Sequence, residues 1–107
     1  MFTGLSNYSQ LVKKDKTLSL EILQEHDNIL TNIFQDYYGN VIKHINESIF
    51  IEFPSATDAT RCALAIQDKL KKFNATSPKD FQINVGLGIH MAEVYEENGD
   101  LFGDGIN

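Results

Sequence analysis

The sequence contains no tryptophan, one cysteine and two prolines among 107 residues. The lone Cys62 excludes an internal disulfide, and its place before the apolar run Ala63-Leu64-Ala65-Ile66 indicates a buried structural thiol. No stretch approaches the roughly 18 to 20 apolar residues of a transmembrane helix, and the N-terminus lacks the features of a signal peptide. These absences predict a cytoplasmic location and no membrane contact by this segment.

Positive charge is also scarce. Nine basic residues face 15 acidic ones, which gives a net charge of −6 and a pI near 4.8. Such a surface repels phosphate backbones and argues against nucleic acid as a partner. The remaining composition, 42% hydrophobic and 22% charged, is typical of a globular domain, and residues 1–107 are interpreted as one domain.

The chain opens with a β-rich segment at residues 1–3, and a helix is expected from Asp15 to Tyr38, where apolar residues recur every three or four positions. Asp15 is a candidate N-cap and Gly39 a candidate stop. A run of this length is often two helices with a kink, whose position the sequence does not define. A strand at residue 1 is what a chain cut upstream would show.

Two β-rich runs, 41–45 and 49–53, flank Asn46-Glu47-Ser48, which predicts a hairpin. After Pro54, the capping-box pattern from Ser55 to Asp58 predicts a second helix that extends to about Phe73. A third β-rich run covers 81–90, and Asn98-Gly99 marks a terminal hairpin that begins near Val94. The expected class is α+β: a ferredoxin-like βαββαβ antiparallel sheet with helices on one face, plus a C-terminal β-hairpin.

Five segments resemble, in order and spacing, the catalytic domain of class III adenylate and guanylate (nucleotidyl) cyclases. The resemblance covers nearly the whole chain, and the last eight residues with the collinear order make it fairly specific. It implies a domain that turns ATP into cyclic AMP and pyrophosphate within cyclic-nucleotide signalling. The segments are Phe2-Thr3 with Tyr8-Ser9, Lys43 and the turn after it, Glu52 to Ala56, Gly88-Ile89-His90, and Asp100 to Asn107.

The resemblance implies two acidic metal ligands, which hold Mg²⁺ or Mn²⁺ against the triphosphate. The matching positions are Gly4 and Glu47, so one carboxylate is missing and the other is longer by a methylene. Two ions stabilise the charge that develops in phosphoryl transfer, and Gly4 offers them no side-chain ligand. Metal binding is therefore doubtful. The alternative interpretation of Glu47 is a solvated turn residue with no metal role. Gly4, followed by Leu5, fits either a plain loop or a nest of backbone N–H groups that holds a phosphate.

The nucleotide-reading positions of the family match Lys43 and Asp100, a donor and an acceptor for the adenine base. Without the resemblance, Lys43 is an exposed strand lysine and Asp100 a turn acid. Asn107 matches the catalytic asparagine that orients the ribose. The family's phosphate-contacting arginine would lie one helical turn beyond Asn107, and the family builds each site from two subunits.

We therefore expect an incomplete cyclase-homology domain, degenerate or truncated, that is inactive or severely impaired by itself. It would associate as a homodimer or with a related cyclase domain and bind a purine nucleoside triphosphate. The alternative is a non-enzymatic ferredoxin-like dimerisation or small-ligand-sensing module. His90, His26 and His44 are too scattered for a zinc site, and we interpret His90 as structural.

Overall fold

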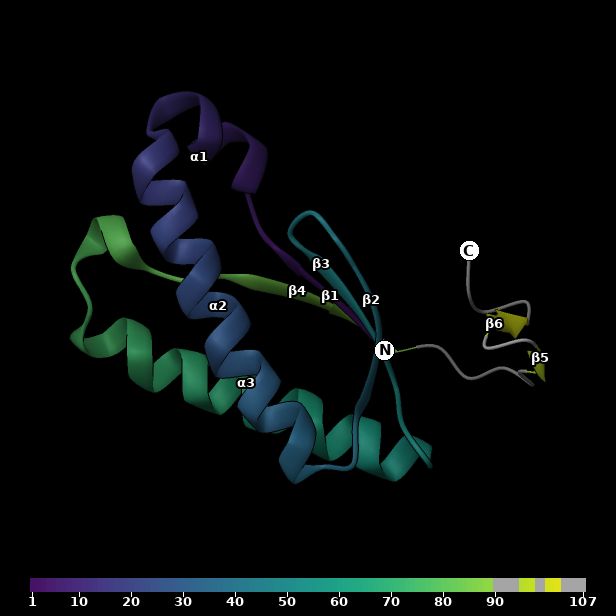
Figure 1. The fold of residues 1–107 in the computed structure, drawn as a ribbon. Helices are drawn as coiled ribbons and strands as arrows, with labels where there is room; N and C mark the ends of the chain where they lie inside the picture. The colour runs from purple at the N-terminus through teal and green to yellow at the C-terminus, as the bar shows by residue number, and fades with distance from the viewer. Residues whose placement is uncertain (90–94, 98–99, 103–107) are drawn as a thin grey trace.

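The computed structural model describes residues 1–89, 95–97 and 100–102. Four strands form the main sheet, two long helices and two short ones connect them, and two further strands pair with each other (Figure 1). In chain order the elements are β1 (Phe2–Leu5), α1 (Tyr8–Lys14), α2 (Lys16–Asp36), β2 (Asn40–Ile45), β3 (Ser48–Glu52), α3 (Ala56–Thr76), the 3₁₀ helix η1 (Lys79–Phe81), β4 (Val85–Gly88), β5 (Tyr95–Glu97) and β6 (Asp100–Phe102).

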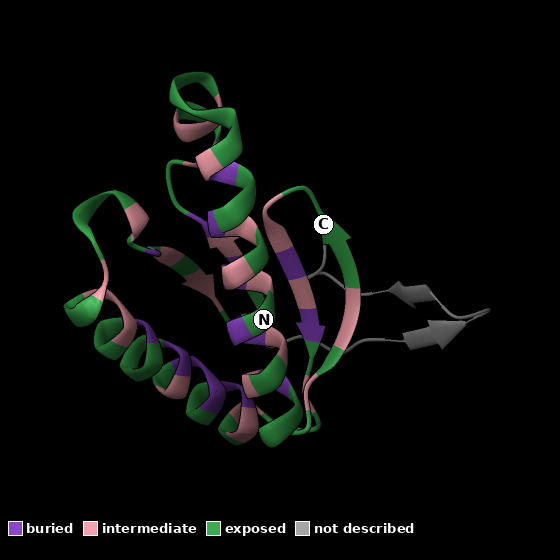
Figure 2. Ribbon diagram, turned by 60° about the vertical axis from the view of Figure 1, so that its left-hand side comes forward, coloured by how far each residue is buried: buried purple, intermediate pink, exposed green. Residues whose placement is uncertain are grey.

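The main sheet has the strand order β2-β3-β1-β4, and every neighbouring pair is antiparallel. Helices α2 and α3 pass over the same face of this sheet (Figures 1 and 2). This arrangement confirms the expected α+β class and the ferredoxin-like order. Strands β5 and β6 form the expected second hairpin, in which Tyr95 pairs with Phe102 and Glu97 with Asp100.

Alternation along the strands separates a face covered by helices from a face on which the described part of the chain places none, called here the helix-free face (Figure 1). Thr3 and Leu5 of β1 are buried, whereas Phe2 is exposed between its strand neighbours. Ile49 and Ile51 of β3 are also buried, and each such apolar side chain stabilises the fold by roughly 1.5 to 3 kcal/mol. The core joins the covered face to both long helices: Leu5, Ile22, Ile29, Leu30, Phe34, Ile49, Ile51, Cys62, Ile66, Leu70 and Ile83.

The first helical region differs from the prediction at its start. A separate helix, α1, occupies residues 8–14, where no helix was expected, and α2 begins after Asp15. The Asp15 side chain accepts a hydrogen bond of 3.0 Å from the Leu18 amide, so this predicted N-cap is confirmed. Only Tyr8 and Leu11 of α1 pack on the core. Two apolar positions are too few to show a helical repeat, so the sequence pattern did not predict this helix.

Helix α2 ends two residues before the predicted boundary. Tyr38 adopts a left-handed conformation with φ 63°, and its amide is 3.4 Å from the Gln35 carbonyl. The Gly39 amide donates to the Phe34 carbonyl at 2.8 Å, which completes a Schellman motif. A Cβ at Gly39 would lie 3.0 Å from Ile51 Cγ2, so a larger residue here would crowd the Ile51 side chain. Gly39 marks the stop as predicted, although Tyr38 carries the left-handed backbone.

The predicted hairpin is confirmed, but its turn is shorter than expected. Ser48 belongs to β3, so Asn46 and Glu47 alone form the turn, with Asn46 at φ 53°. Helix α3 runs three residues past the expected Phe73, and Ser55 caps it: the hydroxyl accepts from the Asp58 amide at 3.1 Å.

The prediction of a strand over 81–90 is wrong for residues 81–84. Phe81 ends η1, and the strand extends only over Val85–Gly88 within the described residues. The Asn74 side chain takes the place of a neighbouring strand: its Oδ1 accepts from the Ile83 amide, and its Nδ2 donates to the Ile83 carbonyl, both at 2.8 Å. Ile83 is fully buried in this way without strand pairing. His90 lies outside the described residues.

None of the helices in the described residues is both long and apolar enough to cross a membrane.

Candidate functional site

The end of β1 and the β2–β3 turn meet at one edge of the sheet. Gly4 lies opposite Ser48 in register, and the Leu5 amide donates to the Glu47 carbonyl at 3.3 Å. The structure therefore brings together Gly4, Leu5 and Glu47, three of the residues that the sequence singled out. Backbone pairing alone fixes this arrangement.

The acidic side chains at this edge do not fit a two-ion site. Glu47 supplies one carboxylate, and across residues 1–89, 95–97 and 100–102 no group of three or more histidine, cysteine, aspartate or glutamate side chains could hold a metal ion. Gly4 leaves room, since an added Cβ would be 3.5 Å from Ser48 Oγ, an ordinary contact. An acidic residue at position 4 would therefore place a second carboxylate beside Glu47.

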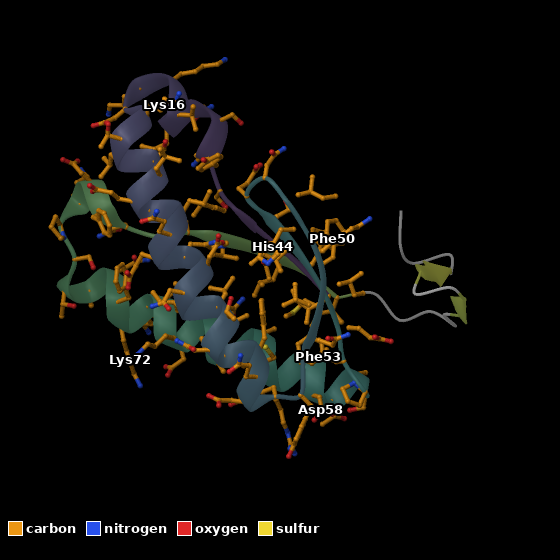
Figure 3. The ribbon with its side chains drawn as sticks, in the orientation of Figure 1. Lys16, His44, Phe50, Phe53, Asp58 and Lys72 are labelled. Atoms are coloured by element: carbon orange, nitrogen blue, oxygen red, sulfur yellow. The ribbon has the colours of Figure 1, made fainter. Side chains whose placement is uncertain are left out.

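Lys43 lies on the helix-free face because of a register shift in β2. Val41 pairs with Ile51 and Lys43 pairs with Phe50, so Ile42 has no partner, as in a β-bulge. Residues directly opposite each other share a face, and Lys43 therefore lies with Phe50. Its Nζ is 5.2 Å from the centre of the Phe50 ring. In Figure 3, Phe50 and His44 lie on opposite sides of the hairpin, with His44 toward α2.

The residues of the helix-free face form two adjacent rows across the four strands. One row carries Lys43 and the two aromatic rings, and the other carries Gly4 near the turn. The rows are about 7 Å apart along the strands, since they are two residues apart. Two of the four members of the second row are glycines, on β1 and β4, whereas Ile45 is the member on the same strand as Lys43. From β2 to β4, the rows are Lys43, Phe50, Phe2, Gly88 and Ile45, Ser48, Gly4, Gly86.

Two of the predicted site residues are described only in part or not at all. Asp100 begins β6 and pairs with Glu97, as the terminal hairpin requires. The predicted catalytic Asn107 lies outside the described residues.

Polar groups are also buried under the covered face. The His26 ring is fully buried on α2, and its Nδ1 is 2.9 Å from Asp27 Oδ1, while its Nε2 has no hydrogen-bond partner. Burial lowers the pKa of His26, the Asp27 hydrogen bond and charge oppose this, and the nearby His44 lowers it further. The Thr3 hydroxyl is buried without a partner as well. These groups belong to the core rather than to the helix-free face.

The Cys62 thiol is fully buried beneath the start of the chain. Burial raises its pKa to about 11, opposed by the charge of the Met1 amine. The Met1 amine donates to the Ile51 carbonyl at 2.8 Å, and burial lowers its pKa. The structural interpretation of Cys62 agrees with this burial.

Sequence reasoning missed the aromatic partners of Lys43. Phe50 lies within the unbroken apolar run Ile49-Phe50-Ile51, so alternation could not assign it to a face. Phe2 is the second residue of the sequence, and the β-rich segment there is too short for alternation to show which face it occupies. The signal that could have revealed both is cross-strand register, which the bulge at Ile42 hides.

Comparison with known sequences gives two significant relatives. The chain is 31% identical over 101 residues to "Putative adenylate cyclase 3" of Rhizobium meliloti, covering 94% of this chain and 17% of that protein. It is 26% identical over 105 residues to the serine/threonine-protein kinase pkn2 of Myxococcus xanthus, covering 97% of this chain and 13% of that protein. The chain thus spans less than a fifth of each relative. No protein-family model matches the sequence.

Solved cyclase structures share the fold. An adenylate/guanylate cyclase/hydrolase from Silicibacter pomeroyi superposes with a TM-score of 0.84 at 25% identity, covering 99% of this chain and 63% of that one. A bacterial light-regulated adenylyl cyclase gives 0.76 at 18% identity, covering 98% and 62%, and the guanylyl cyclase Cya2 gives 0.66 at 10%, covering 99% and 61%. In sequence and in fold, the chain is similar to adenylate/guanylate (nucleotidyl) cyclase domains.

Proposed function

We propose that this domain binds a purine nucleoside triphosphate on the helix-free face but has lost most or all cyclase activity of its own. The observation that carries the proposal is the sheet edge where Gly4 and Glu47 meet. Backbone register holds the two positions together, yet only one of them bears a carboxylate. Two positions that the resemblance assigns to metal ligands are thus neighbours, and they carry one carboxylate between them.

The reaction of the family explains why this loss matters. The ribose 3′-oxygen attacks the α-phosphorus, a 3′,5′-cyclic phosphodiester forms, and pyrophosphate leaves. Negative charge grows on the attacking, equatorial and leaving oxygens, and positioned positive charge must stabilise it. With Gly4 in place of an acidic residue, this end of the sheet offers too few carboxylate ligands for two divalent ions. Glu47 can contribute to holding a single Mg²⁺ or Mn²⁺.

Nucleotide recognition is proposed for residues that keep the family pattern. Lys43 projects from the helix-free face and would donate to an acceptor nitrogen of the base, while Asp100 would accept from its amino group. The Leu5 amide is bonded to the Glu47 carbonyl and the Ser6 amide to the Asn84 carbonyl, so these residues do not offer a nest of free N–H groups for phosphate. Gly4 and Leu5 would instead line the site beside the phosphates, and Asn107 would orient the ribose. The proposed site is cytoplasmic, where nucleoside triphosphates are available.

A partner domain would complete the site. Phe2 and Ile45 on the helix-free face are 48% and 47% exposed, which favours association through that face. We propose a homodimer or pairing with a related cyclase domain. Of these two partners, only the related domain could contribute the missing acidic and basic groups, because a second copy of this chain carries the same Gly4. Sedimentation equilibrium of the purified chain, with Ile45→Glu as the disrupting variant and Leu20→Glu on α2 as the matched control, measures this directly.

The deciding experiment has two parts, turnover and binding. Purified chain is incubated with ATP or GTP and Mg²⁺ or Mn²⁺, and cyclic nucleotide is quantified by chromatography. We expect no steady product. Steady turnover by this chain alone would overturn the proposed inactivity.

Binding is followed with a fluorescent ATP analogue. We expect saturable binding that Lys43→Met weakens by roughly ten- to a hundredfold, since a hydrogen bond to a charged group contributes about 1.5 to 3 kcal/mol. Lys16→Met, which removes an exposed lysine at the start of α2, is the matched control and should bind as the wild type does. Absence of binding at millimolar nucleotide favours the non-enzymatic ferredoxin-like module instead.

A further inference from the structure

A single row of side chains supports Lys43 across the whole sheet. Lys43 pairs with Phe50, Phe50 with Phe2, and Phe2 with Gly88, so one residue from each of the four strands lies in line on the helix-free face. Cross-strand pairs of this kind are the closest side-chain neighbours in a sheet. The position of each member therefore depends on the next.

The contacts along this row are aromatic. Lys43 Nζ lies 5.2 Å from the Phe50 ring centre, within the range of a cation–π interaction. The Phe50 and Phe2 ring centres are 6.1 Å apart with an interplanar angle of 31°, a separation that is favourable for aromatic pairs. Phe2 in turn lies over Gly88, where an added Cβ would overlap its Cε1 and Cζ atoms. Gly88 makes room for Phe2, and Phe2 packs against Phe50.

A free lysine side chain has many rotamers, and fixing them reduces binding free energy. A ring under the ammonium removes part of that freedom before a ligand arrives. Phe50 is half-buried and lies between two partners, whereas Lys43 is exposed. The ring is thus the fixed member of the pair and the ammonium is the member that it orients.

We propose that Phe50, supported by Phe2, is a positioning residue that holds the Lys43 ammonium over the helix-free face for contact with the nucleotide base. This inference rests on the proposed nucleotide-binding function. It adds that the aromatic row, rather than Lys43 alone, determines affinity for the base. Phe50 acts through Lys43 and need not touch the nucleotide.

A double-mutant cycle with ATP tests the inference. Phe50→Leu should weaken ATP binding by roughly two- to fivefold, the amount that corresponds to an exposed cation–π interaction. In the Lys43→Met background the same change should have no effect, because the cation is gone. Phe50→Tyr, which keeps an aromatic face, should restore wild-type affinity. An equal loss in both backgrounds overturns the inference, because it indicates a general structural defect.

The matched control removes an aromatic ring from a similar pair elsewhere. Phe81 and Phe73 have ring centres 6.4 Å apart and lie away from the row. Phe81→Leu should leave ATP affinity unchanged even if it lowers stability. A loss of affinity as large as that of Phe50→Leu contradicts the proposal.

Nuclear magnetic resonance separates this inference from the proposed function. The Lys43 ε-methylene protons should be shifted upfield by the Phe50 ring in the nucleotide-free protein, and Phe50→Leu should abolish that shift. If the variant leaves the signal unmoved, the positioning role is wrong whether or not ATP binds. If the shift is present but wild-type protein binds no ATP, the proposed function fails and the role in nucleotide contact fails with it.

Discussion

The Leu5 amide donates a hydrogen bond of 3.3 Å to the carbonyl oxygen of Glu47, which joins the end of β1 to the β2–β3 turn. This bond involves only backbone atoms, and so does the pairing of Gly4 with Ser48 beside it. The distance between positions 4 and 47 is therefore independent of which side chains they carry. Substitution at Gly4 can change the chemistry of this edge without moving the turn.

Gly4→Asp should create a pair of carboxylates at this edge. Its Cβ meets only Ser48 Oγ at 3.5 Å, and we expect the fold to accept it. Mn²⁺ affinity, measured by isothermal titration calorimetry, should rise by about tenfold, since hard divalent ions prefer more than one carboxylate oxygen.

Gly86→Asp provides the matched control for this gain. Gly86 pairs with Gly4 on the same face, so the variant adds the same charge one strand farther from Glu47. It should bind Mn²⁺ as weakly as the wild type. Equal gains in both variants indicate a general electrostatic effect and argue against a metal position at residue 4.

Tyr38→Gly should stabilise the protein. Tyr38 has φ 63° and is 73% exposed, so the wild type carries a strained backbone with little side-chain burial to offset it. A left-handed conformation costs a non-glycine residue about 1 kcal/mol, and glycine removes this cost. The free energy of unfolding in urea should increase by up to about 1 kcal/mol.

Asn46→Gly is the comparison for Tyr38, since Asn46 is also left-handed at φ 53°. Asparagine tolerates this region better than tyrosine, so the gain should be only a few tenths of a kcal/mol, to order of magnitude. A Tyr38→Gly variant that unfolds at lower urea than the wild type shows that the ring contributes more than its exposure indicates.

His26 should make stability depend on pH below its ordinary pKa of 6.5. Desolvation lowers the pKa of the folded state, so between that lowered value and 6.5 the unfolded chain binds more protons than the native protein. The free energy of unfolding therefore rises with pH through this window and falls on acidification. His26→Gln should flatten urea-derived stability between about pH 5 and about pH 7.

His44 tests whether the effect belongs to the buried ring. His44 is exposed on β2 and near enough to His26 to influence its pKa. His44→Gln should retain most of the wild-type slope. The assignment to His26 is wrong if His26→Gln keeps the full slope and His44→Gln removes it.

Cys62 should resist thiol reagents in the native protein. Burial raises its pKa from 9.0 to about 11, which lowers the thiolate fraction near neutral pH by roughly a hundredfold, and the side chain is fully buried. Absorbance after mixing with an aromatic disulfide reagent should show a reaction at least that much slower in buffer than in denaturing urea. A native rate close to the denatured rate would mean that α3 opens readily.

The raised pKa of Cys62 also predicts that the free energy of unfolding decreases as pH rises from about 9 toward about 11, because the unfolded chain loses its thiol proton first.

Local sequence signals predicted most of the elements correctly. The capping box at Ser55, the N-cap at Asp15 and the turn at Asn46 each rest on bonds between residues at most three apart, and the structure contains them. The strand predicted at 81–84 failed because the partner of Ile83 is the Asn74 side chain, nine residues away. Such a pairing has no local pattern. For Asp100 and Asn107, the roles stay predictions.

The sequence by itself determined the order of the strands and the two long helices, the caps at Asp15 and Ser55, and the lack of an acidic residue at position 4, because these depend on residue identity and short spacing. Only the tertiary structure decided which face Lys43 occupies. Without the shift at Ile42, Lys43 would pair with Ile49 toward the helices, since a change of one residue in register reverses every side chain. The bulge places the ammonium beside Phe50 instead, and a bulge is a property of two strands paired in space, which neither strand's residues specify alone.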